Sequence, residues 1–121
     1  MRIEGKREIL EVESANIADS TFNDVNLSGS KFSEVNLSRV GISGANFTGA
    51  TLEDCAMSGA RFRSMNLTGS SISEVNMTEV TIENATLTGA QIRHCRIDGL
   101  CIDGVPVLEM LAAYREKAES K

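Results

Sequence analysis

Residues 45–49 read Ala-Asn-Phe-Thr-Gly, and the large apolar residue at the centre of this stretch belongs to a long series. Every fifth residue from Ile17 to Ile102 is large and apolar, which makes eighteen consecutive matches. With 41% apolar residues in the chain, a chance run of this length has a probability of roughly 10⁻⁷. The period of five is therefore a structural signal, and it decides the fold.

A period of five fits neither an α-helix, which repeats every 3.6 residues, nor an extended strand, which repeats every two. The residue two before each large apolar one, such as Ala45 before Phe47, is small or β-branched in sixteen of the eighteen units. Eight of the ten glycines come two residues after a large apolar one, where a sharp corner favours a residue without a Cβ. Each unit is thus predicted to be a very short strand followed by a corner.

A second period shows how many corners close one turn of the chain. The stretches NLSG, NFTG, NLTG and TLTG begin at positions 26, 46, 66 and 86, twenty residues apart. Four units therefore make one square coil, and stacked coils form parallel strands about 4.8 Å apart. The sequence predicts an all-β solenoid, a square parallel β-helix of about five 20-residue coils. Its expected parts are a charged cap and first strand over 1–14, the β-helix over 15–104 and a capping α-helix over 105–121.

The unit, written VNLSG at 25–29, ANFTG at 45–49 and MNLTG at 65–69, resembles the pentapeptide repeat over roughly residues 10–107. The resemblance implies a right-handed square β-helix. It also implies one specific activity, since some members of this family mimic DNA, bind DNA gyrase and modulate fluoroquinolone action. The gyrase-directed members are longer, and several have loops that interrupt the coils, which this sequence does not have.

Asn46-Phe47-Thr48 also fits the acceptor pattern for N-glycosylation. Five other stretches fit it, beginning at Asn26, Asn36, Asn66, Asn76 and Asn84. The repeat itself places Asn before and Ser or Thr after the central residue, so we attribute the pattern to the fold. The stacked amides of Asn26, Asn46 and Asn66 are expected to hydrogen-bond along the stack, as in other asparagine ladders.

Composition excludes several classes of function. The net charge of −5 argues against a surface that binds nucleic acid directly. The charged N-terminus has no apolar segment typical of a signal peptide, and no stretch is long enough to span a membrane. We therefore expect a cytoplasmic protein with no membrane association and with reduced cysteines.

The outward columns contain one cluster of charge. Glu34, Asp54 and Glu74 are expected to stack on one corner, with Glu53 beside them. We call Glu34, Glu53, Asp54 and Glu74 the acidic corner. Like charges at this spacing repel one another, so the acidic corner requires solvent, a counterion or a cationic partner.

The sequence provides no combination of acid, base and nucleophile, so we predict a protein that is not an enzyme and uses no cofactor. His94 beside Cys95 suggests a metal site, but Cys95 is expected to face the core, which separates the two side chains. Cys55 and Cys95 share an inward column two coils apart, too far for a disulfide. The prediction is therefore no metal and no catalytic residue.

The segment after Pro106 is predicted to be a helix with one apolar side. Leu108 and Leu111 are expected to plug the last coil. Met110 and Tyr114 widen the apolar surface beyond what a plug needs. A homodimer through this helix, with contacts from Met110, Leu111 and Tyr114, is therefore one predicted assembly.

Two functions follow from these observations. The first is a rigid, non-catalytic interaction or structural module that binds an unidentified protein partner through an outward face. The alternative, which rests on the resemblance, is a DNA-mimicking modulator of DNA gyrase or topoisomerase.

Overall fold

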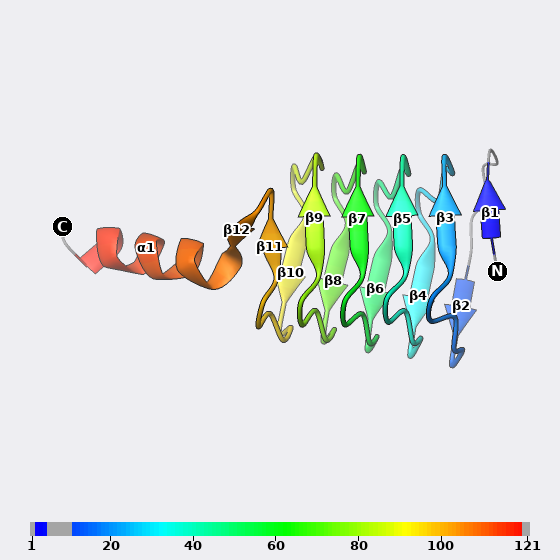
Figure 1. Ribbon diagram of the computed structural model, residues 1–121, viewed down its shortest axis with the longest axis horizontal. Helices are drawn as coiled ribbons and strands as arrows, with labels where there is room; N and C mark the ends of the chain where they lie inside the picture. Colours follow the sequence, from blue (N-terminus) through cyan, green and yellow to red (C-terminus); the bar gives the residue numbers. More distant parts are fainter. Residues whose placement is uncertain (1, 5–10, 120–121) are drawn as a thin grey trace.

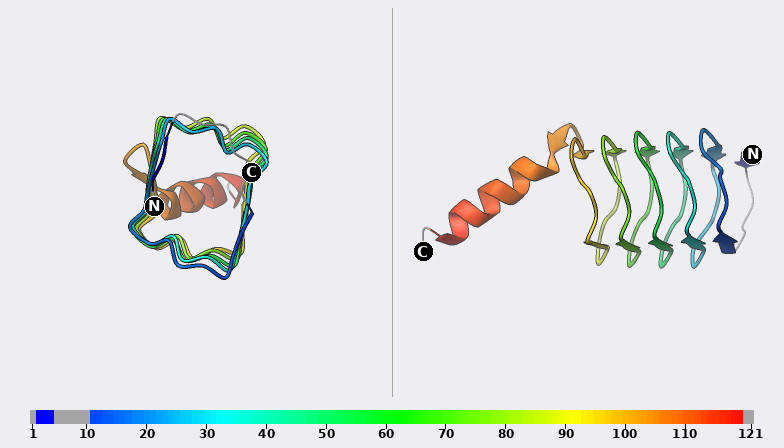
Figure 2. Two further views of the ribbon diagram at one scale, coloured as in Figure 1. Left: turned by 90° about the vertical axis from the view of Figure 1, so that its right-hand side faces the viewer. Right: turned by 90° about the horizontal axis from the view of Figure 1, so that it is seen from below.

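The computed structural model describes residues 2–4 and 11–119. The chain winds into a solenoid of about five stacked coils with one helix at its C-terminal end (Figure 1). Viewed along its axis, each coil is a square (Figure 2). The square β-helix predicted from the period of five is thus confirmed. The predicted charged cap lies largely outside the described residues.

Two opposite sides of the square are sheets, which are parallel except for one antiparallel pair at the C-terminal end. The first sheet contains, in order, β1 (Arg2–Glu4), β3 (Thr21–Asn23), β5 (Gly41–Ser43), β7 (Arg61–Arg63), β9 (Thr81–Glu83), β11 (Cys101–Ile102) and β12 (Val105–Pro106). The second contains β2 (Glu11–Glu13), β4 (Lys31–Ser33), β6 (Thr51–Glu53), β8 (Ser71–Ser73) and β10 (Gln91–Arg93). From β3 to β11 and from β2 to β10, neighbouring strands pair in parallel twenty residues apart, as in Phe22 with Ile42 and Phe32 with Leu52.

The other two sides are held by single β-bridges. One series joins Asn16, Asn36, Ala56, Asn76 and Arg96, and the other joins Asn26, Asn46, Asn66 and Thr86. Both series again step by twenty residues, so every side of the square keeps one register. Outward residues twenty apart therefore lie in columns parallel to the axis.

The core is the stack of inward side chains. Phe47 is 1% exposed, and its ring stacks on that of Phe32 with 6.2 Å between ring centroids. The central residues of the units from Phe22 to Ile82 are all buried. Burial then declines toward the C-terminal end, where Leu87 and Ile97 are only partly covered and Ile92 is 37% exposed. The last coil is therefore incompletely closed.

The asparagines of the repeat form hydrogen bonds with residues two positions later in the chain. The Oδ1 atom of Asn46 accepts hydrogen bonds from the Thr48 N–H at 2.9 Å and from the Thr48 hydroxyl at 2.6 Å. The same pair of bonds recurs at Asn26, Asn66 and Asn76. The Asn-x-Ser/Thr pattern is thus an Asx turn reinforced by the hydroxyl. No bond joins one stacked amide to the next among the described residues, so the predicted asparagine ladder is wrong.

Corners require a left-handed backbone conformation. The eight glycines in register have φ between 67° and 79°, the region that a residue without a Cβ enters at little cost. Twelve described residues other than glycine also occupy it, with φ between 48° and 63°. Some corners are four-residue turns closed by a hydrogen bond, as between Ala50 N–H and Phe47 O at 2.9 Å. Such turns contain Gly29, Gly49, Gly69 and Gly89.

Ser70 is a buried residue whose replacement is expected to stabilise the fold. Its side chain is 1% exposed, and its hydroxyl has no hydrogen-bond partner among the described residues. The column that contains Ser70 has alanine one coil before, at Ala50, so the site accommodates a methyl group. Ser70→Ala should raise the free energy of unfolding by about 1 kcal/mol. Urea denaturation measures this change, and a loss of stability would contradict it.

Ser30→Ala is the matched control for this prediction. Ser30 lies in the same column and is 0% exposed, but its side chain has an interaction partner. The control should therefore give no gain in stability.

The helix α1 (Val107–Glu119) leaves the solenoid at an angle to its end (Figure 2). Val107 packs against the core and Leu111 is partly buried, but no residue of α1 is fully buried. Leu108 is 48% exposed, so the expectation that it plugs the last coil is wrong. A C-terminal helix is confirmed, and it covers this end of the solenoid only in part. In the described part of the chain, no helix has the length and apolar character needed to cross a bilayer.

Candidate functional site

The acidic corner lies where the strands of the second sheet end. Glu34, Asp54 and Glu74 follow β4, β6 and β8, and all three have φ between 53° and 55°. The Glu34 N–H donates to Glu53 O at 3.1 Å, and the Asp54 N–H donates to Ser73 O at 3.3 Å. These bonds hold consecutive corners in line, so the carboxylates recur once per coil on a rigid backbone.

The carboxylates of the acidic corner differ in their local partners. Glu53 lies 3.8 Å from the Lys31 ammonium, and Glu34 accepts a hydrogen bond from the Ser14 hydroxyl at 3.2 Å. Asp54 and Glu74 are exposed, and within the described residues neither side chain has an ion pair or a hydrogen bond. Two unpaired negative charges therefore face solvent on adjacent coils. The structure brings the four predicted residues to one corner, and their role in binding stays a prediction.

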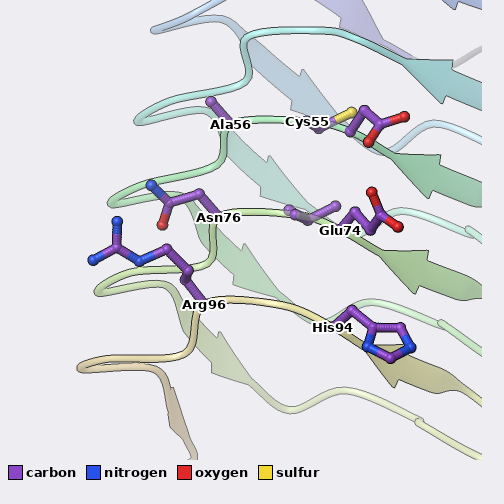
Figure 3. Close-up of a pocket in the computed structure, with 8 residues that line it drawn as sticks. Cys55, Ala56, Glu74, Asn76, His94 and Arg96 are labelled. Atoms are coloured by element: carbon purple, nitrogen blue, oxygen red, sulfur yellow. The ribbon is translucent and has the colours of Figure 1, made fainter.

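A groove runs beside these carboxylates. It has a volume of about 740 Å³ and is lined by Asp54, Cys55, Ala56, Glu74, Val75, Asn76, His94 and Arg96. Its cause is Ala56, which stands in a column otherwise occupied by larger polar side chains (Figure 3). The missing side chain leaves a hollow between coils. The signal in the sequence was alanine at a position where the neighbouring coils have Asn36 and Asn76.

The carboxylates of this corner end at Glu74. His94 continues the column of Glu34, Asp54 and Glu74, and Arg96 continues the column of Ala56 and Asn76 (Figure 3). Arg96 lies 3.7 Å from the Asp98 carboxylate, and both side chains are largely exposed. The groove is therefore lined by carboxylates on two coils and, at its C-terminal end, by the His94 imidazole and by Arg96, which is paired with Asp98. Sequence reasoning did not identify His94 and Arg96 as part of this groove.

Cysteines near the groove are poor candidates for chemistry. The Cys55 thiol is buried, and its sulfur donates to Glu53 O at 3.2 Å and to Phe32 O at 3.6 Å. Burial raises the pKa of Cys55, so the thiolate that a nucleophile needs is disfavoured. The Cys95 sulfur donates to Arg93 O at 3.2 Å. No group of three His, Cys, Asp or Glu side chains in residues 2–4 and 11–119 is placed to hold a metal.

Residues predicted to form a dimer lie on the surface of α1. Tyr114 is 73% exposed and Met110 is 37% exposed. Leu111 points back to the solenoid, where it lines a hollow with Ile92 and Ile97. These three residues thus lie on a helix that the rest of the chain leaves largely uncovered.

Comparisons with known proteins agree with this architecture. The chain resembles a pentapeptide repeat protein from the thylakoid lumen of Arabidopsis thaliana, with 20% identity, a TM-score of 0.72, and coverage of 87% of this chain and 73% of that one. It also resembles HetL, a Nostoc protein involved in regulating heterocyst differentiation, with 18% identity, a TM-score of 0.46, and coverage of 87% and 59%.

A further match is QnrB1, a plasmid-mediated fluoroquinolone resistance protein, with 14% identity, a TM-score of 0.22, and coverage of 97% and 90%. No curated protein sequence matches the chain. A sequence profile described as "Pentapeptide repeat region" matches residues 15–92, which is more than half of the 121 residues. Together with the square β-helix, this match shows that the chain belongs to the pentapeptide repeat family.

Proposed function

We propose that this protein is a rigid, non-catalytic binding module whose acidic corner receives a cationic segment of a protein partner. The observation that supports this proposal is the pair of exposed, unpaired carboxylates of Asp54 and Glu74 beside the groove at Ala56. A lysine or arginine side chain placed there would neutralise charges that otherwise repel one another. Arg96, at the C-terminal end of the groove, would in turn favour an acidic residue at one end of the bound segment.

The backbone suits such a role because binding would require little ordering. Every corner of the site is fixed by hydrogen bonds to the next coil, including Glu74 N–H to Arg93 O at 3.1 Å. A preorganised surface loses less conformational entropy on association than a mobile loop does. Specificity would come from the order of charges along the groove, since rim charges mainly set partner choice and association rate.

The test is capture from a lysate of the native host by the immobilised protein. The triple variant Glu34→Gln, Asp54→Asn and Glu74→Gln removes three negative charges from the acidic corner. A matched control, Asp24→Asn, Glu79→Gln and Glu83→Gln, removes three from other corners and sides of the solenoid. We expect a reproducible partner with the wild type and the control, and its loss with the triple variant. Equal capture by all three proteins would contradict the proposed site.

A groove-filling substitution gives a second test that leaves every carboxylate in place. Ala56→Arg puts into the hollow the residue type that Arg96 provides at the same position two coils later. It should block the partner while the melting temperature stays within a few degrees of the wild-type value. Undiminished binding would show that the groove is not part of the site.

The second candidate function is modulation of DNA gyrase by mimicry of DNA. It is favoured by carboxylates that recur once per coil along a rod, and it is opposed by the Arg96 guanidinium in the adjoining groove. Gyrase supercoiling and fluoroquinolone-stabilised cleavage, assayed with micromolar protein, separate the two candidates. An unchanged enzyme would eliminate mimicry and leave the binding module intact.

A further inference from the structure

A second hollow lies where strands β3, β5 and β7 of the first sheet begin, and it shares no residue with the groove at Ala56. Its volume is about 380 Å³, within the range of roughly 300 to 1,000 Å³ that is usual for small-ligand sites. The residues that line it include Asp19, Thr21, Arg39, Gly41, Gly59 and Arg61. They belong to three successive coils, so the hollow is formed by the stacking of coils.

Gly41 creates the space in this hollow. It lies in a column in which the neighbouring coils have Thr21 and Arg61. A Cβ added to Gly41 would meet no atom within 4 Å, and Gly41 does not have a positive φ. The backbone therefore does not require glycine here, and the effect of glycine is an open space between two polar side chains.

Arg39 is held in a defined orientation at the hollow. Its Nε and Nη2 atoms donate to the Oδ1 and Oδ2 atoms of Asp19 at 2.8 and 3.1 Å. Hydrogen bonding to Arg39 lowers the pKa of Asp19, so this carboxylate is ionised at neutral pH and the pair is maintained. A guanidinium has five N–H donors. Asp19 takes two of those of Arg39, and the others are left for a further acceptor.

Arg61 has no compensating charge. Its side chain is exposed, and it has no ion pair or hydrogen bond within residues 2–4 and 11–119. By contrast, Arg63 on the same strand lies 3.8 Å from the Glu83 carboxylate. The charges of Asp19 and Arg39 cancel, so Arg61 leaves the hollow with one net positive charge in a chain whose net charge is −5.

We propose that this hollow binds a carboxylate group, which lies over Gly41 between the guanidiniums of Arg39 and Arg61. A free guanidinium such as that of Arg61 can donate two parallel N–H bonds to the two oxygens of a carboxylate. Arg39 then contributes donors that Asp19 does not use, and the Thr21 hydroxyl contributes another. The carboxylate belongs either to an acidic side chain or to the C-terminus of a peptide, since both present the same group.

Charge favours a carboxylate over a phosphate monoester. One carboxylate balances the single net positive charge of the hollow. A phosphate monoester has a charge of about −1.5 to −2 at pH 7, and the excess would be repelled by the nearby Asp19 carboxylate. This inference does not depend on the proposed role of the acidic corner, because the two sites share no residue.

Nuclear magnetic resonance titration of the nitrogen-15-labelled full chain tests the inference. N-acetylglutamate N-methylamide presents a side-chain carboxylate, N-acetylalanine presents a terminal one, and N-acetylglutamine N-methylamide is the uncharged control. We expect saturable shifts of the Arg39 and Arg61 Nε–H signals and of the Gly41 amide with at least one of the two acids. The acid that binds more tightly identifies the source of the carboxylate. Shifts that do not saturate with either acid, or equal shifts with the uncharged control, would overturn the inference.

Three variants separate a built site from general attraction to arginine. Arg61→Gln should raise the dissociation constant of the acid at least about tenfold, because it removes a charged hydrogen-bond donor. Arg63→Gln is the matched control on the same strand and should leave binding unchanged. Gly41→Thr fills the space with the residue type of Thr21 and Thr81 in the same column and leaves every charge in place.

Gly41→Thr should abolish binding while its melting temperature is no lower than that of the wild type, since threonine is favoured in a strand. Unchanged binding by Gly41→Thr, or equal effects of Arg61→Gln and Arg63→Gln, would show that the hollow is not the site. Inorganic phosphate, added as a competitor at constant ionic strength, should displace the acid less effectively than acetate does. Stronger displacement by phosphate would overturn the assignment of a carboxylate.

Discussion

Phe47→Ala lowers the free energy of unfolding by about 3 to 5 kcal/mol, because the truncation leaves a cavity in a core that has no room to collapse. Phe47 is 1% exposed, and its ring stacks on Phe32. The backbone around it cannot relax inward, since it is bonded to the coils on both sides, as by Phe47 N–H to Asn66 O at 2.7 Å. A loss of this size is a large share of a total stability of about 5 to 15 kcal/mol.

Thr48→Ala is the control for this experiment, because Thr48 is the next residue and points outward. It removes only the hydroxyl bond to Asn46 and should cost about 1 kcal/mol. Chemical denaturation of both variants at one temperature measures the difference. Equal losses would mean that the assignment of inward and outward residues is wrong.

Gly49→Val is expected to cost about 1 to 3 kcal/mol through backbone strain alone. Gly49 has φ of +69°, and a Cβ placed on it would meet no atom within 4 Å. Steric clash with neighbours is therefore not the cause of the loss. A β-branched side chain is strongly disfavoured in the left-handed region, whereas glycine enters it freely.

Gly41→Val is the matched control, because a Cβ added to Gly41 would also meet open space, but Gly41 does not have a positive φ. It lies in strand β5, where glycine is unfavourable and valine is favoured. This variant should be neutral or more stable by up to about 1 kcal/mol. Thermal melts that rank the two variants in the opposite order would contradict the assignment of corners and strands.

The sequence predicted the fold well because each of its two periods has one simple geometric meaning. The five-residue period separates Phe47, which points inward, from Asn46 and Thr48, and the twenty-residue period fixes which corners stack. The acidic corner could be predicted for the same reason, since the register alone places Glu34, Asp54 and Glu74 in one column.

Features that depend on a single side chain or on few contacts were not predictable in this way. From the sequence, the Asn46 amide could form hydrogen bonds either with the stacked asparagines or with Thr48. In the structure its oxygen accepts bonds from Thr48, which is only two residues away. The direction of α1 depends on contacts at Val107 and Leu111 rather than on a repeat, so the exposure of Leu108 had no periodic signal. The groove depends on one small residue, Ala56, whose effect appears only when its column is assembled.

The measurement that tests the proposed function most directly is the salt dependence of affinity for the captured partner. Exposed charges contribute less to the binding free energy as ionic strength rises, because the Debye length falls to about 8 Å at 0.15 M. We expect wild-type binding to weaken steeply from about 50 to 300 mM salt. The variant Glu34→Gln, Asp54→Asn and Glu74→Gln should bind weakly at all salt concentrations, with a shallow slope. Identical affinities and slopes for the two proteins would contradict the acidic corner as the binding site.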